Sequence, residues 1–325
     1  MSVLTDSRFL LRRPTLADAQ AVTDLINAAD AHDYGDTDMT IEDVREEFAG
    51  VDLATDAWLL ERHTDDAAVG VAFVESRAGV KLIASLYVHP AERGQGIGRE
   101  LALLVEERGR ALVADAPEGA RVTLNGWIKG DSEPELCWAR RLGFRRERSF
   151  LRMQIRMTEA PPSPSWPEGF ELRTFRPGSD ERIVFDAVEE AFSDHWGHVP
   201  SRLEEWLRRT KRADFDPTLW FLAFDGEQLA ATSLCETMPD ARGWVSSLAV
   251  RRPWRHRGLA RAILLASLGE FWRRGRPTVA LGVDAQSLTG ATRLYESVGM
   301  SVRERHDQVT KLLRDGTDLQ VRSLD

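Results

Sequence analysis

Cysteine is scarce in this chain of 325 residues: only Cys137 and Cys235 are present, without a CxxC pair or a Cys/His cluster. Isolated cysteines of this kind argue against a disulfide framework and a structural zinc site, so we expect no metal. Long apolar runs are also missing, because the longest, "AILLASL" at 262–268, is too short to span a bilayer. The first residues carry no secretory signal. We therefore expect a soluble, cytoplasmic protein with no membrane partner.

Lysine is rare as well, and acidic residues outnumber basic ones, which gives a formal net charge of −9. Proteins that bind nucleic acids generally present a basic face. We therefore expect no nucleic-acid partner. Arginine nevertheless gathers in "RRPWRHRGLARAIL" at 251–264, and this local cluster needs its own explanation.

Several short stretches occur twice, 162 residues apart. "WLL" begins at Trp58 and "WFL" at Trp220, while "RGQGIG" begins at Arg93 and "RHRGLA" at Arg255. A repeat of this length is a whole domain rather than a solenoid unit. A proline-rich segment, "TEAPPSPSWPEG", separates the copies and cannot continue a helix or a sheet interior. The sequence predicts an N-terminal domain at 1–158, a linker at 159–168 and a C-terminal domain at 169–325.

Each copy has a mixed order of strands and helices. In the second copy we expect helices at 183–192, around 202–209, after "RHRGLA" and at 289–299, and strands at 170–173, 220–224, 229–236, 244–250, 278–284 and near 308–312. The strand at 244–250 is largely apolar, as a central strand should be. The predicted fold class is α/β with α+β character: two tandem domains, each with a mixed central sheet flanked by helices.

The strand, glycine-containing turn and helix at the centre of each copy suggest a phosphate cradle. A helix N-terminus presents unpaired N–H groups, and small residues let an anion approach them. Arg93, Arg255 and Arg257 would add positive charge there. A glycine-rich helix start can also serve only packing or capping, but the repetition after two apolar strands favours a cradle. The pattern is neither a Walker loop nor a dinucleotide fingerprint.

Both segments resemble the Arg/Gln-x-x-Gly-x-Gly/Ala motif of the GCN5-related N-acetyltransferase (GNAT) superfamily. In the second copy, "VDAQSLTGATRLYESVGM" at 283–300 is similar to the family's block of a strand, Asn-x-x-Ala-x-x-Leu-Tyr and Gly-Phe. The chain is identified as a tandem GNAT protein on this resemblance. The sequence departs from the pattern at Ser287, where many relatives have asparagine, and at Met300, where phenylalanine is usual.

The resemblance implies acetyl-CoA as the cosubstrate, held by backbone groups of the motif and of the strand before it. In the second copy the implied cofactor-binding residues are Leu248, Ala249, Val250, Arg255, His256, Arg257, Gly258, Leu259, Ala260 and Ser287. In the first copy they are Leu86, Tyr87, Val88, Arg93, Gly94, Gln95, Gly96, Ile97 and Gly98. A strand N–H would polarise the thioester carbonyl as an oxyanion hole does.

The family tyrosine, a general acid for the departing thiolate, falls on Tyr295. Alignment through Gly299 and Gly143 puts Ala139 at that place in the first copy. The N-terminal domain is therefore expected to be catalytically degenerate, although it can still hold CoA. Without the motif, Tyr295 would be interpreted as a buried aromatic residue of an amphipathic helix.

A general base must remove a proton from the acceptor ammonium, directly or through water. Glu236, at the end of a strand beside the cofactor strand, is the first candidate, and Asp284 is the second. Each could equally be a solvated carboxylate at a strand end. His256 is expected to face the diphosphate or solvent.

The loop "SDHWGHVP" lies between the first two helices of the second copy, a region that covers the acceptor in this family. Asp194, His195 and Trp196 are the candidate substrate-binding residues, and the alternative for His195 and His198 is a cap on the core. The resulting hypothesis is an acetyl-CoA-dependent N-acetyltransferase, a monomer or homodimer, that acetylates a primary amine of a small molecule or peptide in its C-terminal domain. The alternative is a non-catalytic acyl-CoA-binding or sensing protein.

Overall fold

The computed structural model describes residues 6–35, 37–287 and 290–320. Their contacts define two compact units. Unit 1 contains Met1–Glu147 and Asp307–Leu319, and unit 2 contains Arg148–His306 and Gln320–Asp325. Within the described residues, no helix is long and apolar enough to cross a membrane.

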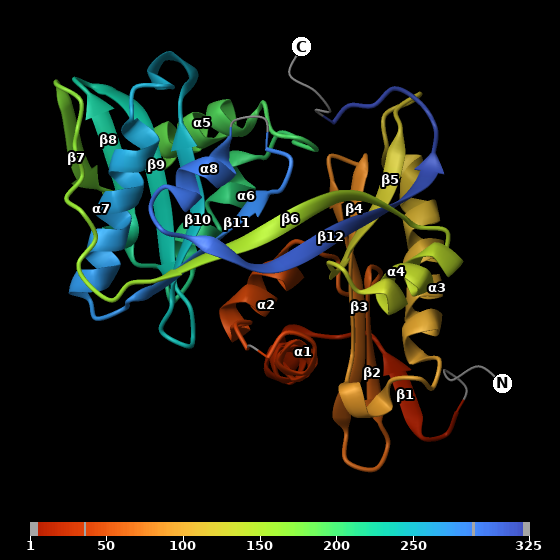
Figure 1. Ribbon diagram of the computed structural model, residues 1–325. Helices are drawn as coiled ribbons and strands as arrows, with labels where there is room; N and C mark the ends of the chain where they lie inside the picture. Colours follow the sequence, from red (N-terminus) through yellow and green to blue (C-terminus); the bar gives the residue numbers. More distant parts are fainter. Residues whose placement is uncertain (1–5, 36, 288–289, 321–325) are drawn as a thin grey trace. The chain divides into compact units, whose positions relative to one another are not determined.

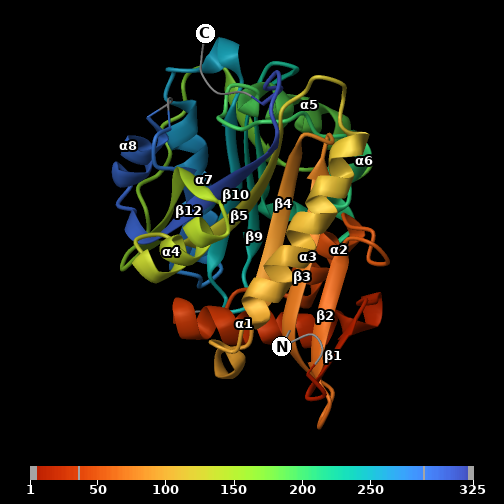
Figure 2. The same cartoon turned by 90° about the vertical axis from the view of Figure 1, so that its right-hand side faces the viewer.

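Unit 1 is a mixed sheet with helices on both faces (Figure 1). Its strands lie in the order β1 (Phe9–Arg12), β2 (Ala57–Arg62), β3 (Ala67–Arg77), β4 (Lys81–Val88), β5 (Val122–Lys129) and β12 (Ser301–Arg314), of which the residues from Asp307 belong to this unit. Helices α1 (Ala19–Asp33) and α2 (Ile41–Ala49) cover one face, and α3 (Ile97–Leu112), which Figure 2 shows lying along β4, covers the other together with α4 (Glu133–Arg141).

Strand alternation explains why unit 1 has a core on each side of its sheet. Along β3, Val71 and Phe73 pack against α1 and α2, whereas Ala72 and Val74 pack against the α3 side. Successive side chains of a strand point to opposite faces, so one buried strand supplies both cores.

Helix α2 begins with a capping box. The Asp43 N–H donates to Thr40 Oγ1 and the Thr40 N–H donates to Asp43 Oδ2, both at 2.9 Å. Such reciprocal caps satisfy N–H groups that a helix start would otherwise leave unpaired. Val44 and Phe48, four residues apart, are the buried face of α2. Their burial fixes the rotation of the helix about its axis.

Unit 2 repeats this arrangement. Its strands lie in the order β6 (Arg145–Arg156, in this unit from Arg148), β11 (Thr278–Asp284), β10 (Gly243–Val250), β9 (Gln228–Thr237), β8 (Trp220–Asp225) and β7 (Phe170–Thr174). Helices α5 (Glu181–Phe192) and α6 (Leu203–Trp206) pack on one face, whereas α7 (Leu259–Arg273) and α8 (Ala291–Glu296) contribute to the core of the other.

The last strand of each sheet comes from the opposite half of the sequence. In unit 2, β6 is antiparallel to β11, from Phe150 opposite Asp284 to Arg156 opposite Thr278. In unit 1, the buried side chain of Asn125 on β5 accepts hydrogen bonds from Gln308 and Thr310 of β12. The domain limits drawn from the repeat, 1–158 and 169–325, are sequence limits and stay a prediction. Residues 159–167 form neither helix nor strand.

Most elements expected in the second copy are present, with three differences. Helix α6 spans only Leu203–Trp206 and is followed by a short 3-10 turn, because the residues after Leu207 are charged or polar and offer no further apolar side chain to the core. Helix α8 spans Ala291–Glu296, and residues 288–289 of the expected helix lie outside the described residues. The closing strand is longer than expected, since β12 begins at Ser301.

Candidate active site

The loop before α7 has the backbone geometry of an anion cradle. Gly258 caps the helix with a φ of +83°, and His256 has a φ of +62°. Left-handed residues in such a loop help to turn successive N–H groups toward one side, next to the unpaired N–H groups of the helix start. A methyl group built on Gly258 would meet no atom within 4 Å, so the space at the cap is open. The loop therefore suits the diphosphate of an acyl-CoA.

The first copy has the same loop with glycine at both positions. The φ angle is +79° at Gly94 and +95° at Gly96, which caps α3. A non-glycine residue rarely adopts a left-handed conformation, and holding one there stores strain. His256 therefore shows that the second loop keeps this conformation where the sequence no longer provides the glycine.

In the second copy, Arg255, the first arginine of the motif, is engaged by other residues of the protein. Arg255 donates from Nε to the Val250 carbonyl at 3.2 Å, from Nη1 to Asp194 Oδ2 at 2.9 Å and from Nη2 to the Ala191 carbonyl at 3.1 Å. Arg252 donates to both oxygens of Asp194. These two arginines, Arg252 first, lower the pKa of Asp194 to about 2. Arg255 therefore anchors the loop, whereas Arg257 is exposed beside the cap.

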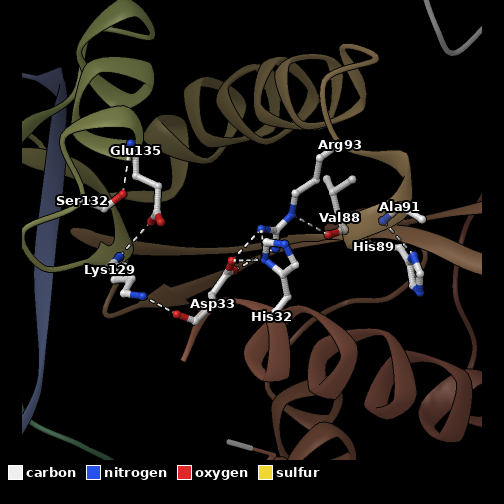
Figure 3. Close-up of polar contacts among 9 residues, drawn as sticks. All are labelled: His32, Asp33, Val88, His89, Ala91, Arg93, Lys129, Ser132 and Glu135. Atoms are coloured by element: carbon white, nitrogen blue, oxygen red, sulfur yellow. Dashed lines mark hydrogen bonds and ion pairs between the residues drawn. The ribbon is translucent and has the colours of Figure 1, made fainter. Parts of the chain in front are cut away.

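Arg93 makes the matching contacts in the first copy (Figure 3). It donates from Nε to the Val88 carbonyl at 3.3 Å and from its two terminal nitrogens to the Asp33 carboxylate at 2.6 and 2.8 Å. Lys129 Nζ donates to the Asp33 carbonyl, and the Lys129 N–H donates to Glu135 Oε2 at 2.8 Å. In both copies, then, the first arginine of the motif ties the cradle to the end of the preceding strand and to the end of the first helix.

The strand before each cradle separates from its parallel neighbour. In the described residues, β10 pairs with β11 over Gly243–Val245, and β4 pairs with β5 over Lys81–Ile83. The later residues, 248–250 and 86–88, have register partners on β9 and β3. One edge of each strand is therefore open to an extended ligand that pairs as an additional strand would. This is where the resemblance places the pantetheine arm.

A β-bulge interrupts β10 just before its open part. The register with β9 shifts between Val245 and Ser247, and Ser246 Oγ donates to the Leu234 carbonyl at 2.9 Å. Bulges bend a strand and redirect its groups. The sequence offers no separate signal for this bulge, because "WVSSLAV" is uniformly suited to a strand.

Tyr295 and Ala139 occupy the same place in their local structures. The Met300 N–H donates to the Tyr295 carbonyl at 3.1 Å, and the Phe144 N–H donates to the Ala139 carbonyl at 3.0 Å. The intervening glycines, 143 and 299, both have positive φ, as in other helix C-caps. The Tyr295 side chain is 7% exposed, and burial raises its pKa to about 12. The phenol therefore keeps its proton near neutral pH.

The two candidate bases have different surroundings. Asp284 forms a bidentate ion pair with Arg148, whose Nη2 lies 2.7 Å from Oδ2. These hydrogen bonds engage both oxygens of the Asp284 carboxylate. Glu236 is half-buried on β9. It lies opposite Trp244, which precedes Ser246 of the β10 bulge by two residues. Sequence reasoning missed Arg148 because it lies 136 residues before its partner.

The residues of the predicted substrate loop differ in their contacts. Asp194 is bound by arginines, as described. The ring centroids of His195 and Phe192 lie 4.3 Å apart, and burial, followed by the charge of Arg255, lowers the pKa of His195. The guanidinium carbon of Arg148 lies 5.1 Å from the Trp196 ring centroid. His195 is therefore neutral at physiological pH and packs against the end of α5.

The remaining predicted residues frame the two cradles. Ile97 and Leu259 are buried in their cores, Gln95 donates to Glu92, and Ser287 lies in the turn after β11. Sequence reasoning missed Trp138, which precedes Ala139. A methyl group on Gly98 would lie 3.8 Å from Trp138 Cζ2 and 3.7 Å from Val88, so this indole borders the open part of β4.

Comparisons with known proteins agree with this geometry. The profile of the acetyltransferase (GNAT) family matches residues 20–120 and 182–300. The chain belongs to the GNAT family. One match in each half confirms the tandem architecture and the mixed α/β fold predicted from the repeat, and the protein is an N-acetyltransferase.

Among curated relatives, a protein named mycothiol acetyltransferase from Thermobispora bispora is 35% identical over 66% of this chain and 71% of its own length. A solved GCN5-related N-acetyltransferase from Sphaerobacter thermophilus is 40% identical, covers 97% of this chain and 98% of its own, and superposes with a TM-score of 0.78. A tandem GNAT protein from the clavulanic acid biosynthesis pathway shares the fold at 16% identity, 95% and 99% coverage and a TM-score of 0.66.

Proposed function

We propose that this GNAT protein transfers an acetyl group from acetyl-CoA to a primary amine of a small molecule or peptide, and that unit 2 performs the reaction. The observation that carries this proposal is the pair Tyr295 and Ala139. Both copies have the cradle and the open strand, but only the second has a protonated phenol at the helix position that corresponds to Ala139.

Each residue then has a separate role. Acetyl-CoA supplies the acetyl group as a thioester, with its diphosphate against the loop 255–260 and its arm along 248–250. Glu236 accepts a proton from the acceptor ammonium, so that the neutral amine can attack the thioester carbonyl. Tyr295 holds the proton that the departing thiolate requires. Asp284 is the weaker candidate for the base because Arg148 occupies its oxygens.

The N-terminal cradle is proposed to bind CoA without catalysis. Its left-handed Gly94 and Gly96 correspond to the left-handed His256 and Gly258 of unit 2, and its open strand matches that of unit 2, while Ala139 removes the proton donor. Gly94 and Gly96 precede α3 with positive φ, and only Gly98 lies inside the helix, where a glycine costs roughly 1 kcal/mol relative to alanine. Glycine at these positions would let an anion approach the backbone N–H groups closely.

Thiol release measured with acetyl-CoA and a panel of amines tests the proposal. The panel begins with a mycothiol-related amine, after the name of the curated relatives, and adds aminoglycosides, amino-acid conjugates and peptide N-termini. Tyr295→Phe should lower kcat by roughly tenfold to a thousandfold with little change in acetyl-CoA affinity. Tyr34→Phe, a matched change in unit 1, should leave kcat unchanged. An unaltered kcat in Tyr295→Phe would exclude unit 2 Tyr295 as the proton donor.

A further inference from the structure

The loop after α5 contacts residues at the ends of both β10 and β11, the parallel strands between which the open edge of β10 lies. On the β10 side, Asp194 accepts a hydrogen bond of 2.9 Å from Arg255, which also donates to the carbonyl of Val250. Two residues later, the Trp196 ring lies beneath the guanidinium group of Arg148, with 5.1 Å between the ring centroid and the guanidinium carbon. One short segment, residues 194–196, makes both contacts, and we call it the clasp.

Arg148 is itself fixed at the end of β11. Its Nε and Nη2 atoms donate to Asp284, the last residue of this strand, at 2.7 to 3.0 Å, and Nη2 also donates to the Gln286 carbonyl at 3.1 Å. The side chain is largely buried, and the attraction between a cation and an aromatic face is strongest where water is excluded. Because β10 and β11 are parallel, their ends lie at the same edge of the sheet. The clasp therefore bridges the two strand ends.

Unit 1 has the same kind of contact, built from different residues. Tyr34 lies 162 residues before Trp196, which is the spacing of the sequence repeat. The Nζ atom of Lys129, the last residue of β5, lies 5.3 Å from the Tyr34 ring centroid and donates to the Asp33 carbonyl. The Asp33 carboxylate binds Arg93 of the first cradle (Figure 3). A cation over an aromatic ring at this place therefore occurs in both units, although the two cations come from different strands.

The clasp lies on the face of the sheet to which the proposed base points. Helix α5, which leads into the clasp, packs on this face against Leu234, whereas α7, which follows the cradle, packs on the opposite face. Side chains two residues apart on a strand share a face, so Glu236 points to the α5 side together with Leu234. An acceptor bound at Glu236 would therefore approach the open edge of β10 from the side of the clasp.

We propose that Arg148 is a positioning residue for the acetyl transfer proposed for unit 2, and that it acts through Trp196 by holding the clasp over the acceptor side of the open edge. This inference rests on that proposed function. Without Arg148 the clasp would be held at one end, by Arg255, and the acceptor would be less well oriented. The effect should appear in the KM for the acceptor. The cradle keeps its own anchor, so the affinity for acetyl-CoA should change little.

A double-mutant cycle on the full chain tests this role, with an amine that the wild type acetylates. Arg148→Met should raise the KM for that amine about tenfold and leave the KM for acetyl-CoA within about twofold of the wild type. Trp196→Leu should give a similar rise, and the double variant should be no worse than either single one, because both changes break the same contact. Trp196→Phe keeps an aromatic face and should retain most of the wild-type affinity.

Arg182→Met, at an exposed arginine of α5 that pairs with Asp186, is the control and should change neither KM. Additive effects of Arg148→Met and Trp196→Leu would overturn the proposal, because independent sites add. Equal rises in the two KM values would also overturn it, since a general loss of structure affects both substrates.

Hydrogen exchange read by mass spectrometry needs no acceptor and separates this inference from the proposed function. The amides of His195 and His198 donate to backbone carbonyls of the loop. They should exchange about fivefold faster in Arg148→Met than in the wild type, while α7 stays protected. Trp196→Leu should give the same increase, so either variant serves if the other fails to fold. Unchanged exchange would show that the contact does not hold the clasp. If the wild type acetylates no amine, the proposed function fails, and exchange still decides whether Arg148 holds the loop.

Discussion

Arg255 and Asp194 join the cradle of unit 2 to the loop after α5 through a hydrogen bond of 2.9 Å. Arg252 binds the same carboxylate, so one acidic side chain holds both ends of the turn that precedes α7. Asp194 therefore positions the cradle. To contact the acceptor, Asp194 would have to break its hydrogen bonds to both arginines.

Asp194→Asn should destabilise the protein by about 1 kcal/mol and raise the KM for acetyl-CoA several-fold, because both arginines lose an ionic partner. The folded pKa of Asp194 lies below the usual value of 3.8, so the stabilisation is present above that pH and is lost as pH falls toward 2. The stability difference between the two proteins should be constant from pH 5 to 8 and shrink below about pH 4. Denaturant midpoints across pH measure it. Asp186→Asn, in an exposed pair with Arg182, should have a much smaller effect on stability.

Glu236→Gln should reduce kcat/KM by roughly 10²- to 10⁴-fold at pH 7, the usual contribution of a general base. The deficit should narrow as pH approaches the pKa of the acceptor amine, because neutral amine then exists without a base. Steady-state rates from pH 6 to 10 reveal this trend. Asp284→Asn should lower thermal stability because Arg148 loses its ion pair. Its kcat/KM should not show the pH-dependent narrowing expected of Glu236→Gln. A deficit in Glu236→Gln that is independent of pH would speak for a structural role.

Calorimetry with CoA should detect two sites per chain. Gly96→Asp should remove the N-terminal site and Gly258→Asp the C-terminal one, because both glycines have positive φ and a carboxylate there repels the diphosphate. Only Gly258→Asp should abolish acetyl transfer. Gly226→Asp, at another glycine of positive φ, controls for backbone strain alone. A single site that survives Gly96→Asp would show that the first loop is scaffold.

Glu47→Gln should stabilise the protein at neutral pH. The folded pKa of Glu47 is about 7, above the value of 4.5 for an exposed glutamate, so burial favours the protonated form. The wild type is then most stable below pH 4.5 and loses up to about 3 kcal/mol as pH rises through 7. Glutamine lacks this loss. Unfolding curves at pH 4.5 and 8 should give similar stabilities at the lower pH and a more stable variant at the higher one.

Local signals in the sequence were sufficient to predict the glycine-containing turn before α3 and α7 and most of the strands. The strand at 278–284 has its predicted limits, since an apolar run between turn residues needs no distant information. The alignment of Tyr295 with Ala139 agrees with the backbone, because the glycine that ends each helix fixes the register.

Long-range pairing could not be predicted in this way. Arg148 meets Asp284 and Arg255 meets Asp194 only after the strands and helices between them have packed. Glu46 and Glu47 are adjacent and chemically identical in the sequence. Only the rotation of α2, set by the burial of Val44 and Phe48, places the Oε2 atom of Glu47 in a buried position.

Because β6 and β12 each complete the sheet formed by the other half of the sequence, the sheet of unit 1 is completed late in synthesis. The ribosome makes residues Met1–Glu147 of unit 1 first. The sheet of this unit can add β12 only after Asp307–Leu319 have been synthesised. At a translation rate of about 5–20 residues per second, this interval lasts roughly 10 to 30 s. Throughout it, β5 is an edge strand without its final neighbour, open to pairing with other chains. We therefore expect the nascent chain to be most exposed to pairing with other chains while its second half is being made.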